Sequence, residues 1–184
     1  MKSFFIPAVS TVALAFAAPA MAQTAPDLAH PSYYGSIGDS YLTPGYNGGI
    51  DEITGRLGAR LGQSWGVEGE IGAGISANQA GSAAGSRYTT EPVVGAGYLV
   101  GYLPIAPRID LLGRVGYGAS SFNQTVNGVR SSSVTNSVNF GVGAQYWLTS
   151  VDAVRADYTR RDYLGTSAIP SGGDVWGVSW VRKF

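Results

Sequence analysis

The sequence predicts an all-β fold: an eight-stranded antiparallel up-and-down transmembrane β-barrel that follows a cleaved signal peptide. Three observations predict it. Eight segments alternate apolar residues with polar residues or glycine at a period of two, which is typical of strands with two different faces. Glycine accounts for 27 of the 184 residues, which disfavours helices. An apolar run near the N-terminus has the form of a secretory signal.

Residues 1–22 have the parts of a secretory signal peptide. A basic residue precedes a short apolar run, and Ala20 and Ala22 form a cleavage site of the A-x-A type. The alternative, an uncleaved membrane anchor, is disfavoured because the run is too short to span a bilayer. We therefore expect a cleaved signal peptide, a short periplasmic lead over residues 23–32 and a barrel domain over residues 33–184.

The composition excludes several classes of function. The chain has 12 basic and 12 acidic residues, so its charge gives no reason to expect nucleic acid as a partner. It has no cysteine, which excludes disulfides, thiolate chemistry and cysteine-ligated metals. His30 is the only histidine, which sharply limits acid–base catalysis. We expect no catalytic, cofactor-binding or metal-binding residues.

The first four predicted strands cover residues 33–42, 50–61, 65–76 and 91–103. The first is the weakest because tyrosine stands on both of its faces. The second and third alternate apolar side chains with charged residues and glycine, and the fourth alternates bulky apolar residues with glycine. The residues assigned to their apolar faces are Tyr33, Ile37, Tyr41, Ile53, Leu57, Ala59, Leu61, Trp65, Val67, Ile71, Ala73, Ile75, Val94, Ala96, Tyr98, Val100 and Tyr102.

The last four predicted strands cover residues 109–121, 137–148, 151–162 and 174–184. The segment 137–148 has the most regular alternation, and each of the eight is about as long as a tilted strand that crosses a bilayer. The residues assigned to their apolar faces are Ile109, Leu111, Val115, Tyr117, Val138, Phe140, Val142, Ala144, Tyr146, Leu148, Val154, Ala156, Tyr158, Trp176, Val178, Trp180 and Phe184.

The connections between these strands alternate in length. "GQSW", "PIAPR" and "TS" are tight, whereas "TPGYNGG", "SANQAGSAAGSRYTT", "FNQTVNGVRSSSVTN" and "YLGTSAIPSGG" are longer and rich in small polar residues. Short turns at one end and long polar loops at the other are typical of outer-membrane barrels. A soluble barrel of the lipocalin type has no reason to sort its connections in this way.

The polar face contains glycine and large charged residues of both signs. Such a face suits the interior of a narrow barrel, where small residues leave room for large ones, better than the surface of a soluble protein. Unpaired charges in a poorly hydrated lumen would be costly, so we expect an interior ion-pair cluster, with Arg56 and Arg60 beside Glu68 and Glu70. The alternative is a set of solvated surface charges. The expected cluster comprises Glu52, Arg56, Arg60, Glu68, Glu70, Asp110, Arg114, Arg155 and Asp157.

Aromatic residues of the apolar face fall at two levels, as in the interfacial girdles of membrane barrels. The expected periplasmic girdle comprises Tyr33, Trp65, Tyr102, Tyr146 and Phe184. The expected outer girdle comprises Tyr41, Tyr117, Tyr158 and Trp176.

The signal peptide, the eight alternating strands and the terminal "WGVSWVRKF" together resemble the small eight-stranded outer-membrane barrels, the OmpA-type transmembrane domain and the opacity-protein, porin-like family. The resemblance implies a C-terminal strand that the barrel-assembly machinery recognises. Arg182 departs from the aromatic or apolar residue that is usual at its position. The residues expected to carry this insertion signal are Trp176, Gly177, Trp180 and Phe184.

The resemblance further implies a non-enzymatic protein in the outer membrane of a Gram-negative bacterium, in contact with outer-membrane lipid and lipopolysaccharide. We expect a structural or narrow porin-like barrel, favour a monomer, and expect the long loops to serve contact or adhesion, with no loop ligand identified. One alternative is a barrel-embedded lipid-modifying enzyme, disfavoured because His30 precedes the first strand and Glu68 and Glu70 have arginine neighbours. The other alternative is a soluble lipocalin-like binding barrel.

Overall fold

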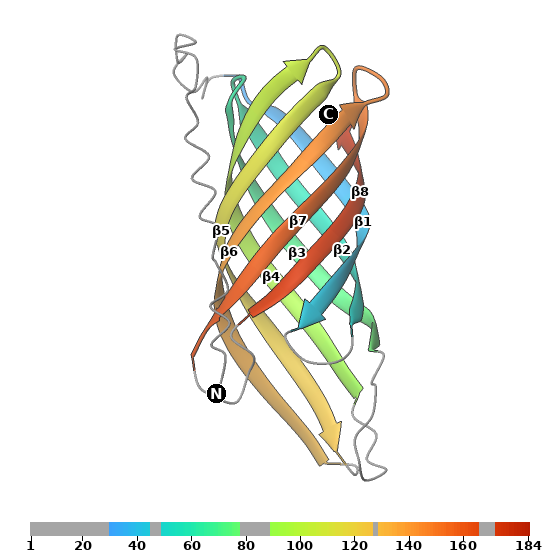
Figure 1. The fold of residues 1–184 in the computed structure, drawn as a ribbon, viewed down its shortest axis with the longest axis vertical. Helices are drawn as coiled ribbons and strands as arrows, with labels where there is room; N and C mark the ends of the chain where they lie inside the picture. The colour runs from blue at the N-terminus through green and yellow to red at the C-terminus, as the bar shows by residue number, and fades with distance from the viewer. Residues whose placement is uncertain (1–29, 45–48, 78–88, 127–128, 166–171) are drawn as a thin grey trace, which may run out of the picture.

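The protein forms a closed antiparallel barrel, as the sequence predicts (Figure 1). The computed structural model describes residues 30–44, 49–77, 89–126, 129–165 and 172–184. The predicted signal peptide, its cleavage site at Ala20 and Ala22 and most of the predicted lead lie outside the described residues. The strands are β1 (Ser32–Pro44), β2 (Ile50–Leu61), β3 (Trp65–Ala77), β4 (Thr89–Ala106), β5 (Ile109–Val126), β6 (Val129–Trp147), β7 (Asp152–Leu164) and β8 (Gly172–Lys183).

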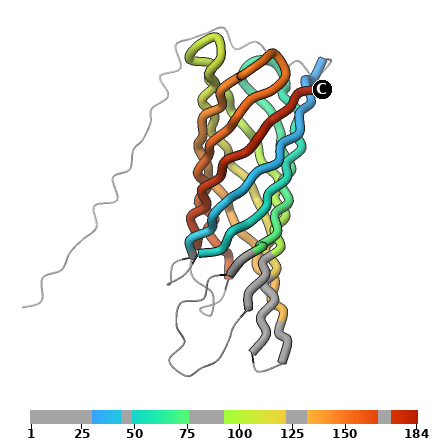
Figure 2. The backbone as a smooth tube through the Cα atoms, turned by 90° about the vertical axis from the view of Figure 1, so that its right-hand side faces the viewer, coloured from blue at the N-terminus to red at the C-terminus, as the bar shows by residue number. Residues whose placement is uncertain are grey.

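Each strand pairs with its neighbour in sequence, and β8 pairs with β1 to close the sheet. Figure 2 shows the first and last strands side by side, wound obliquely around the barrel. Their pairing runs from Tyr34 opposite Lys183 to Pro44 opposite Gly173, and the amide of Phe184 donates to the carbonyl of Tyr33 at 3.1 Å. Closure satisfies the backbone groups of both edge strands, which lipid cannot hydrogen-bond.

The two ends of the barrel differ. Residues 62–64, 107–108 and 148–151 form short connections at the end where the chain terminates, which we call the tight-turn end (Figure 1). Gly62 has a φ of 82°, a left-handed conformation that favours glycine in this turn. Short turns of bacterial outer-membrane barrels face the periplasm, so the predicted outer-membrane location would place the tight-turn end on that side. The described residues contain no helix long and apolar enough to cross a membrane.

The apolar face of the sheet points outward. Ile71 is 73% exposed and Val142 and Val178 are each 59% exposed, whereas Arg56 and Glu70 are 5% and 3% exposed. A soluble barrel buries its apolar side chains inside and exposes its charges. The observed arrangement is the reverse, so it contradicts the soluble lipocalin-like alternative and suits a barrel surrounded by lipid.

The predicted facing of β4 is wrong. Leu99 and Leu103 point outward, together with Gly95 and Gly97. The residues that the sequence assigned to the lipid face instead point into the barrel, and Tyr102 therefore does not belong to the periplasmic girdle. These residues are Val94, Ala96, Tyr98, Val100 and Tyr102.

The inversion of β4 has a physical reason. Residues directly opposite one another in a sheet point to the same face, and Tyr98 lies opposite Glu68 of β3, which is buried in the lumen. The strand carries apolar residues on both faces, so its pattern does not distinguish them. In the lumen the tyrosine hydroxyls find hydrogen-bond partners and the apolar side chains pack with Leu112. These contacts favour the observed facing of β4.

The other aromatic residues of the two expected girdles face outward. Tyr158 and Trp176 pack together at the long-loop end, with ring centroids 4.8 Å apart. Outward-facing aromatic rings near both rims are typical of barrels anchored at two membrane interfaces. The exposed members are Tyr33, Trp65, Tyr146, Phe184, Tyr41, Tyr117 and Trp176.

The predicted loop between β5 and β6 is largely strand. The two strands pair as far as Val126 opposite Val129, so residues 122–126 and 129–136 belong to a hairpin. These residues escaped the strand count because they lack an apolar face, which a strand outside the membrane does not need. β4 also begins two residues earlier and ends three residues later than expected, at Thr89 and Ala106.

The long β5–β6 hairpin projects past the rest of the barrel at the end opposite the C-terminus (Figure 1). β6 pairs with β7 only from Asn136 onward, so residues 129–135 pair with β5 alone. β4 joins the projection through residues 89–92, which pair with β5 but not with β3. We call this three-stranded extension the β4–β6 wing.

Asp39 is an exception on the lipid-facing surface. Its side chain is exposed, and it lies opposite Ile53 and Val178, which are 48% and 59% exposed. It makes no ion pair or side-chain hydrogen bond within the described part of the chain. A carboxylate at this position faces the acyl chains and is expected to reduce stability.

Candidate functional site

The barrel interior contains a network of buried charges contributed by β2, β3, β5 and β7. Their side chains share the inward parity of each strand, so the pleat of the sheet directs all of them to the lumen. The network holds as many arginines as carboxylates and carries no net charge. Its members, which we call the lumen network, are Glu52, Arg56, Arg60, Glu68, Glu70, Asp110, Arg114, Arg155, Asp157 and Arg161.

Arg56 links two sides of the barrel. Its Nε donates to Glu70 Oε2 at 2.8 Å, as the pairing of β2 with β3 allows. Its terminal nitrogens donate to both carboxylate oxygens of Asp157 on β7, at 2.8 and 3.0 Å. A two-bond arginine–carboxylate contact fixes both distance and orientation. The Arg56 side chain therefore crosses the lumen and holds β7 to β2.

Arg114 on β5 crosses the same space from another direction. Its terminal nitrogens lie 3.1 Å from Glu68, 3.2 Å from Glu70 and 2.8 Å from Asp157. Arg155 donates to Glu68 Oε2 at 2.6 Å. The three carboxylates thus each contact at least one arginine from another strand, so the charges are paired as their burial requires.

Arg161 belongs to the network but was not among the residues predicted for it. Its terminal nitrogens lie 3.1 Å from Glu52 and 3.4 Å from Glu70, and its side chain is 1% exposed. The signal was present, because Arg161 has the same parity as Arg155 and Asp157 on one strand. The alternation of β7 therefore extends further toward the long loops than the sequence analysis followed it.

Arg60 does not pair with Glu68 or Glu70. The β2–β3 register places Gly66 opposite Arg60, and the side chain instead reaches Asp110 on β5 at 2.9 Å. Asp110 Oδ2 also accepts a hydrogen bond from the Trp147 indole at 3.0 Å. This pair lies at the tight-turn end, separate from the central ion pairs.

Three inward-facing tyrosines, which the sequence analysis did not include, extend the network. The Tyr34 hydroxyl donates to Glu68 at 2.8 Å and contacts the Tyr102 hydroxyl at 2.8 Å, while the Tyr98 hydroxyl donates to Glu70 at 3.2 Å. The arginines stack on these rings, since guanidinium carbons lie 4.3, 4.6 and 5.3 Å from the ring centroids of Tyr102, Tyr98 and Tyr34.

Glycine makes room for these large side chains. A Cβ added at Gly141 would lie 2.8 Å from Arg114, and one added at Gly58 would lie 2.2 Å from the Tyr34 ring. Both distances are shorter than van der Waals contact. The glycines at these inward positions are therefore a packing requirement, because arginine and tyrosine side chains lie across the backbone of the neighbouring strand.

The residues expected to carry the insertion signal lie on β8 and at the C-terminus. Trp176, Trp180 and Phe184 point outward with 61%, 46% and 82% exposure, and Gly177 lies on the inward face. Arg182, which departs from the family pattern, lies 3.6 Å from Asp152 on β7. Recognition of this strand by the assembly machinery stays a prediction.

The described residues offer no group of three or more metal-ligating side chains. Each of the lumen carboxylates forms at least one ion pair with an arginine, so their charges are paired within the network.

The comparison with solved structures finds outer-membrane barrels. OprG of Pseudomonas aeruginosa matches with a TM-score of 0.65 and 13% identity, over 84% of this chain and 96% of that chain. The N-terminal barrel domain of Pseudomonas aeruginosa OprF gives 0.63 and 12%, over 84% and 100%. Ail, the attachment invasion locus protein of Yersinia pestis, gives 0.53 and 17%, over 84% and 97%. At these identities the similarity shows the fold.

The family comparison extends over most of the sequence. The model for the outer membrane protein beta-barrel domain matches residues 8–184. The comparison with curated proteins finds no significant match. With its closed eight-stranded sheet, outward apolar face and ion-paired lumen, the chain belongs to the outer membrane protein β-barrel domain family.

Proposed function

We propose that this protein is a non-enzymatic outer-membrane barrel with a closed lumen that presents its β4–β6 wing and long loops to the outside of the cell. The observation that carries the proposal is the lumen network. Its charges span the barrel from β2 and β3 to β5 and β7, and Arg56, Glu70 and Arg114 are each at most 5% exposed. An eight-stranded barrel is just wide enough for its interior to be filled by side chains.

The network supports a plug in preference to an open pore. Arg56 and Arg114 both bind Asp157 across the lumen, so opening a path would require several charge-assisted hydrogen bonds to break together. It also disfavours a barrel-embedded enzyme, since the buried carboxylates are held by arginine and the single histidine of the sequence precedes β1. The alternative is a narrow porin-like path through the lumen, and the following measurement would detect it as an open current level in the wild-type protein.

Ion conductance of the refolded protein in planar bilayers tests the closed lumen. We expect the wild-type protein to show no sustained open level. The double variant Arg56→Ser with Asp157→Ser removes one charge of each sign and two large side chains from the lumen, so it is expected to conduct ions. The measurement is the single-channel current at fixed voltage and salt.

The matched control is Arg160→Ser with Asp174→Ser. These residues form an ion pair at 3.1 Å on the outer face near the long loops, so the variant removes the same charges without opening the lumen. It should behave like the wild type. A sustained wild-type current as large as that of the Arg56 and Asp157 variant would refute the closed lumen.

The β4–β6 wing supports a role in contact with external surfaces. Its backbone extends beyond the strands that form the barrel wall, and the sequence of residues 129–135, "VRSSSVT", contains one charged residue. Substituting a two-residue Asn-Gly turn for residues 123–132 keeps the remaining β5–β6 register, because Asn123 pairs with Ser132.

This shortened variant is expected to fold and reach the membrane like the wild type but to lose the adherence of expressing cells to surfaces. Adherence of cells that express either form, at equal surface levels, is the measurement. Equal adherence of the two forms on every surface to which the wild-type cells bind would contradict the contact role.

The cellular setting completes the proposal. Membership in the outer-membrane barrel family supports a location in the outer membrane, and the N-terminal signal pattern supports export in a Gram-negative bacterium. The outward apolar face fits lipid and lipopolysaccharide as neighbours, and the aromatic residues of the last strand fit recognition by the assembly machinery. A monomer is favoured because closure leaves no unpaired edge within the barrel wall.

A further inference from the structure

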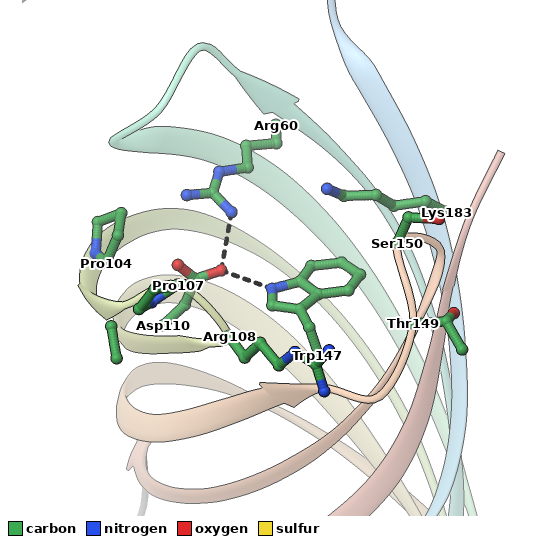
Figure 3. Close-up of a pocket in the computed structure, with 10 residues that line it drawn as sticks. Arg60, Pro104, Pro107, Arg108, Asp110, Trp147, Thr149, Ser150 and Lys183 are labelled. Carbon is green, nitrogen blue, oxygen red and sulfur yellow. Dashed lines mark hydrogen bonds and ion pairs between the residues drawn. The ribbon is translucent and has the colours of Figure 1, made fainter.

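A cavity lined by basic residues lies at the tight-turn end of the barrel. The cavity has a volume of about 480 Å³ and is lined by residues that include Arg60, Arg108, Asp110, Trp147 and Lys183 (Figure 3). This volume lies within the range of sites that bind small molecules. We call the cavity the vestibule.

The positive charge of the vestibule is not neutralised by its own residues. Asp110 is the one carboxylate among the lining residues, and its Oδ2 already accepts from Arg60 and the Trp147 indole. Arg108 and Lys183 form no ion pair with any carboxylate in the described part of the chain. Arg108 and Lys183 therefore add two positive charges to a lining whose one carboxylate, Asp110, is already paired with Arg60.

The Lys183 ammonium and the backbone of Arg108 have defined positions. The Lys183 ammonium lies 4.1 Å from the centroid of the Trp147 ring, and Figure 3 shows it reaching over that ring toward the side of the vestibule that holds Arg60. The carbonyl of Arg108 accepts from the amide of Trp147 at 2.8 Å, which anchors the turn that carries the guanidinium. Ser150 adds a hydroxyl at the rim.

The vestibule is a closed-ended site. Beyond it, toward the barrel centre, the next cavity has a volume of about 10 Å³ and is lined by residues that include Tyr34, Tyr102 and Arg155. The Tyr34 and Tyr102 hydroxyls lie 2.8 Å apart and Arg155 binds Glu68 at 2.6 Å, so side chains seal the floor. A ligand of this site would enter and leave at the tight-turn mouth.

We propose that the vestibule binds a phosphate group at the periplasmic end of the barrel, held by Arg108 and Lys183 with help from the Ser150 hydroxyl. A phosphate offers several oxygens and up to two negative charges, which matches two unpaired cations and a hydroxyl donor around an open cavity. The phosphate belongs either to a soluble periplasmic anion or to the headgroup of a lipid in the adjacent leaflet. This inference does not depend on whether the lumen conducts ions.

The full-length folded protein in an uncharged detergent provides the test. Inorganic phosphate is titrated while the indole N–H signal of Trp147 is followed by NMR, the signal being assigned by its loss in Trp147→Phe. We expect a saturable shift, and we expect Arg108→Gln with Lys183→Gln to weaken binding by at least about tenfold through loss of two charge-assisted contacts. Lys183→Gln alone should give a smaller loss and serves if the double variant does not fold.

Arg182→Gln is the matched control because it removes the neighbouring cation, which lies on the outer face of the same strand. Its affinity should stay within about twofold of the wild type. A second arm replaces inorganic phosphate with phosphatidylglycerol added to the detergent. Tighter binding in that arm, still dependent on Lys183, assigns the phosphate to a lipid headgroup, and tighter binding of inorganic phosphate assigns it to a soluble anion. Absence of a saturable shift with both probes, or an equal loss in Arg182→Gln, overturns the proposal.

Discussion

Replacing Glu70 with alanine is expected to lower the free energy of unfolding by about 3–5 kcal/mol, because it leaves the buried, otherwise neutral network with one uncompensated positive charge. Glu70 contacts Arg56 at 2.8 Å, Arg114 at 3.2 Å and Arg161 at 3.4 Å, and it accepts a hydrogen bond from Tyr98. Urea-induced unfolding of the refolded protein in lipid vesicles measures the change. Glu70→Gln keeps the shape and a hydrogen-bond acceptor, so its loss should be smaller.

Removing a carboxylate from the opposite face should have the opposite sign. Asp39 faces outward between Ile53 and Val178, two residues from the outer-girdle Tyr41, so Asp39→Val is expected to stabilise the barrel by up to about 1 kcal/mol in the same assay. Both variants remove one carboxylate, so a difference in the sign of their effects reports the location of the carboxylate, in the lumen or on the lipid-facing surface. A loss below about 1 kcal/mol for Glu70→Ala, or a destabilised Asp39→Val, would contradict the assignment of the two faces.

Introducing a charge on the lipid face should be nearly as disruptive. Val142 is 59% exposed on β6, four residues from the aromatic Tyr146 toward the long-loop end. Val142→Arg places a guanidinium among acyl chains, between the levels of Tyr146 and Asn136, and is expected to cost about 2–4 kcal/mol. The measurement is again urea-induced unfolding in vesicles, supported by the shift between folded and unfolded migration on a gel when samples are heated.

The control keeps the strand, the face and the new residue but changes the depth. Asn136 is exposed on the outward face of β6, six residues beyond Val142 toward the long loops. Asn136→Arg should cost no more than about 1 kcal/mol, because the side chain can reach water. Equal costs at the two positions would show that the outward face of β6 does not meet a hydrocarbon core.

The alternation of the sequence predicted most strands closely. β2 has the predicted limits, Ile50 and Leu61, and β3 extends the prediction by one residue. Prediction of strand facing succeeded where one face is apolar and the other carries charge, as in β2, β3 and β7, because the membrane and the lumen demand opposite chemistry. Strand prediction failed at the β5–β6 hairpin, where both faces meet water and no apolar period marks the strand.

The lumen network shows where sequence information ends. Parity alone identified nine of its charged members, and following it further along β7 would have found Arg161. The ion-pair partners were harder to predict from the sequence. Arg60 was expected near Glu68, but it reaches Asp110 on β5. Which arginine meets which carboxylate depends on the register between strands and on the reach of side chains across the lumen.

The facing of the apolar residues of β4 is a second feature that the sequence did not predict. Val100 and Leu99 are both hydrophobic, yet the first is fully buried in the lumen and the second faces lipid. No local pattern separates them, because a narrow lumen accepts aliphatic side chains beside ion pairs. The choice follows from the pairing of Tyr98 with Glu68 across the sheet, which is a contact between distant parts of the chain.

By itself, the sequence determined that the chain is a β-barrel, that its strands have one apolar face, and that charges of both signs occupy the other face. Local alternation carries this information because successive side chains in a strand point to opposite sides. The tertiary structure alone decided the facing of β4, the partners of each arginine and the basic vestibule, because these depend on register and closure, which bring together residues remote in the chain.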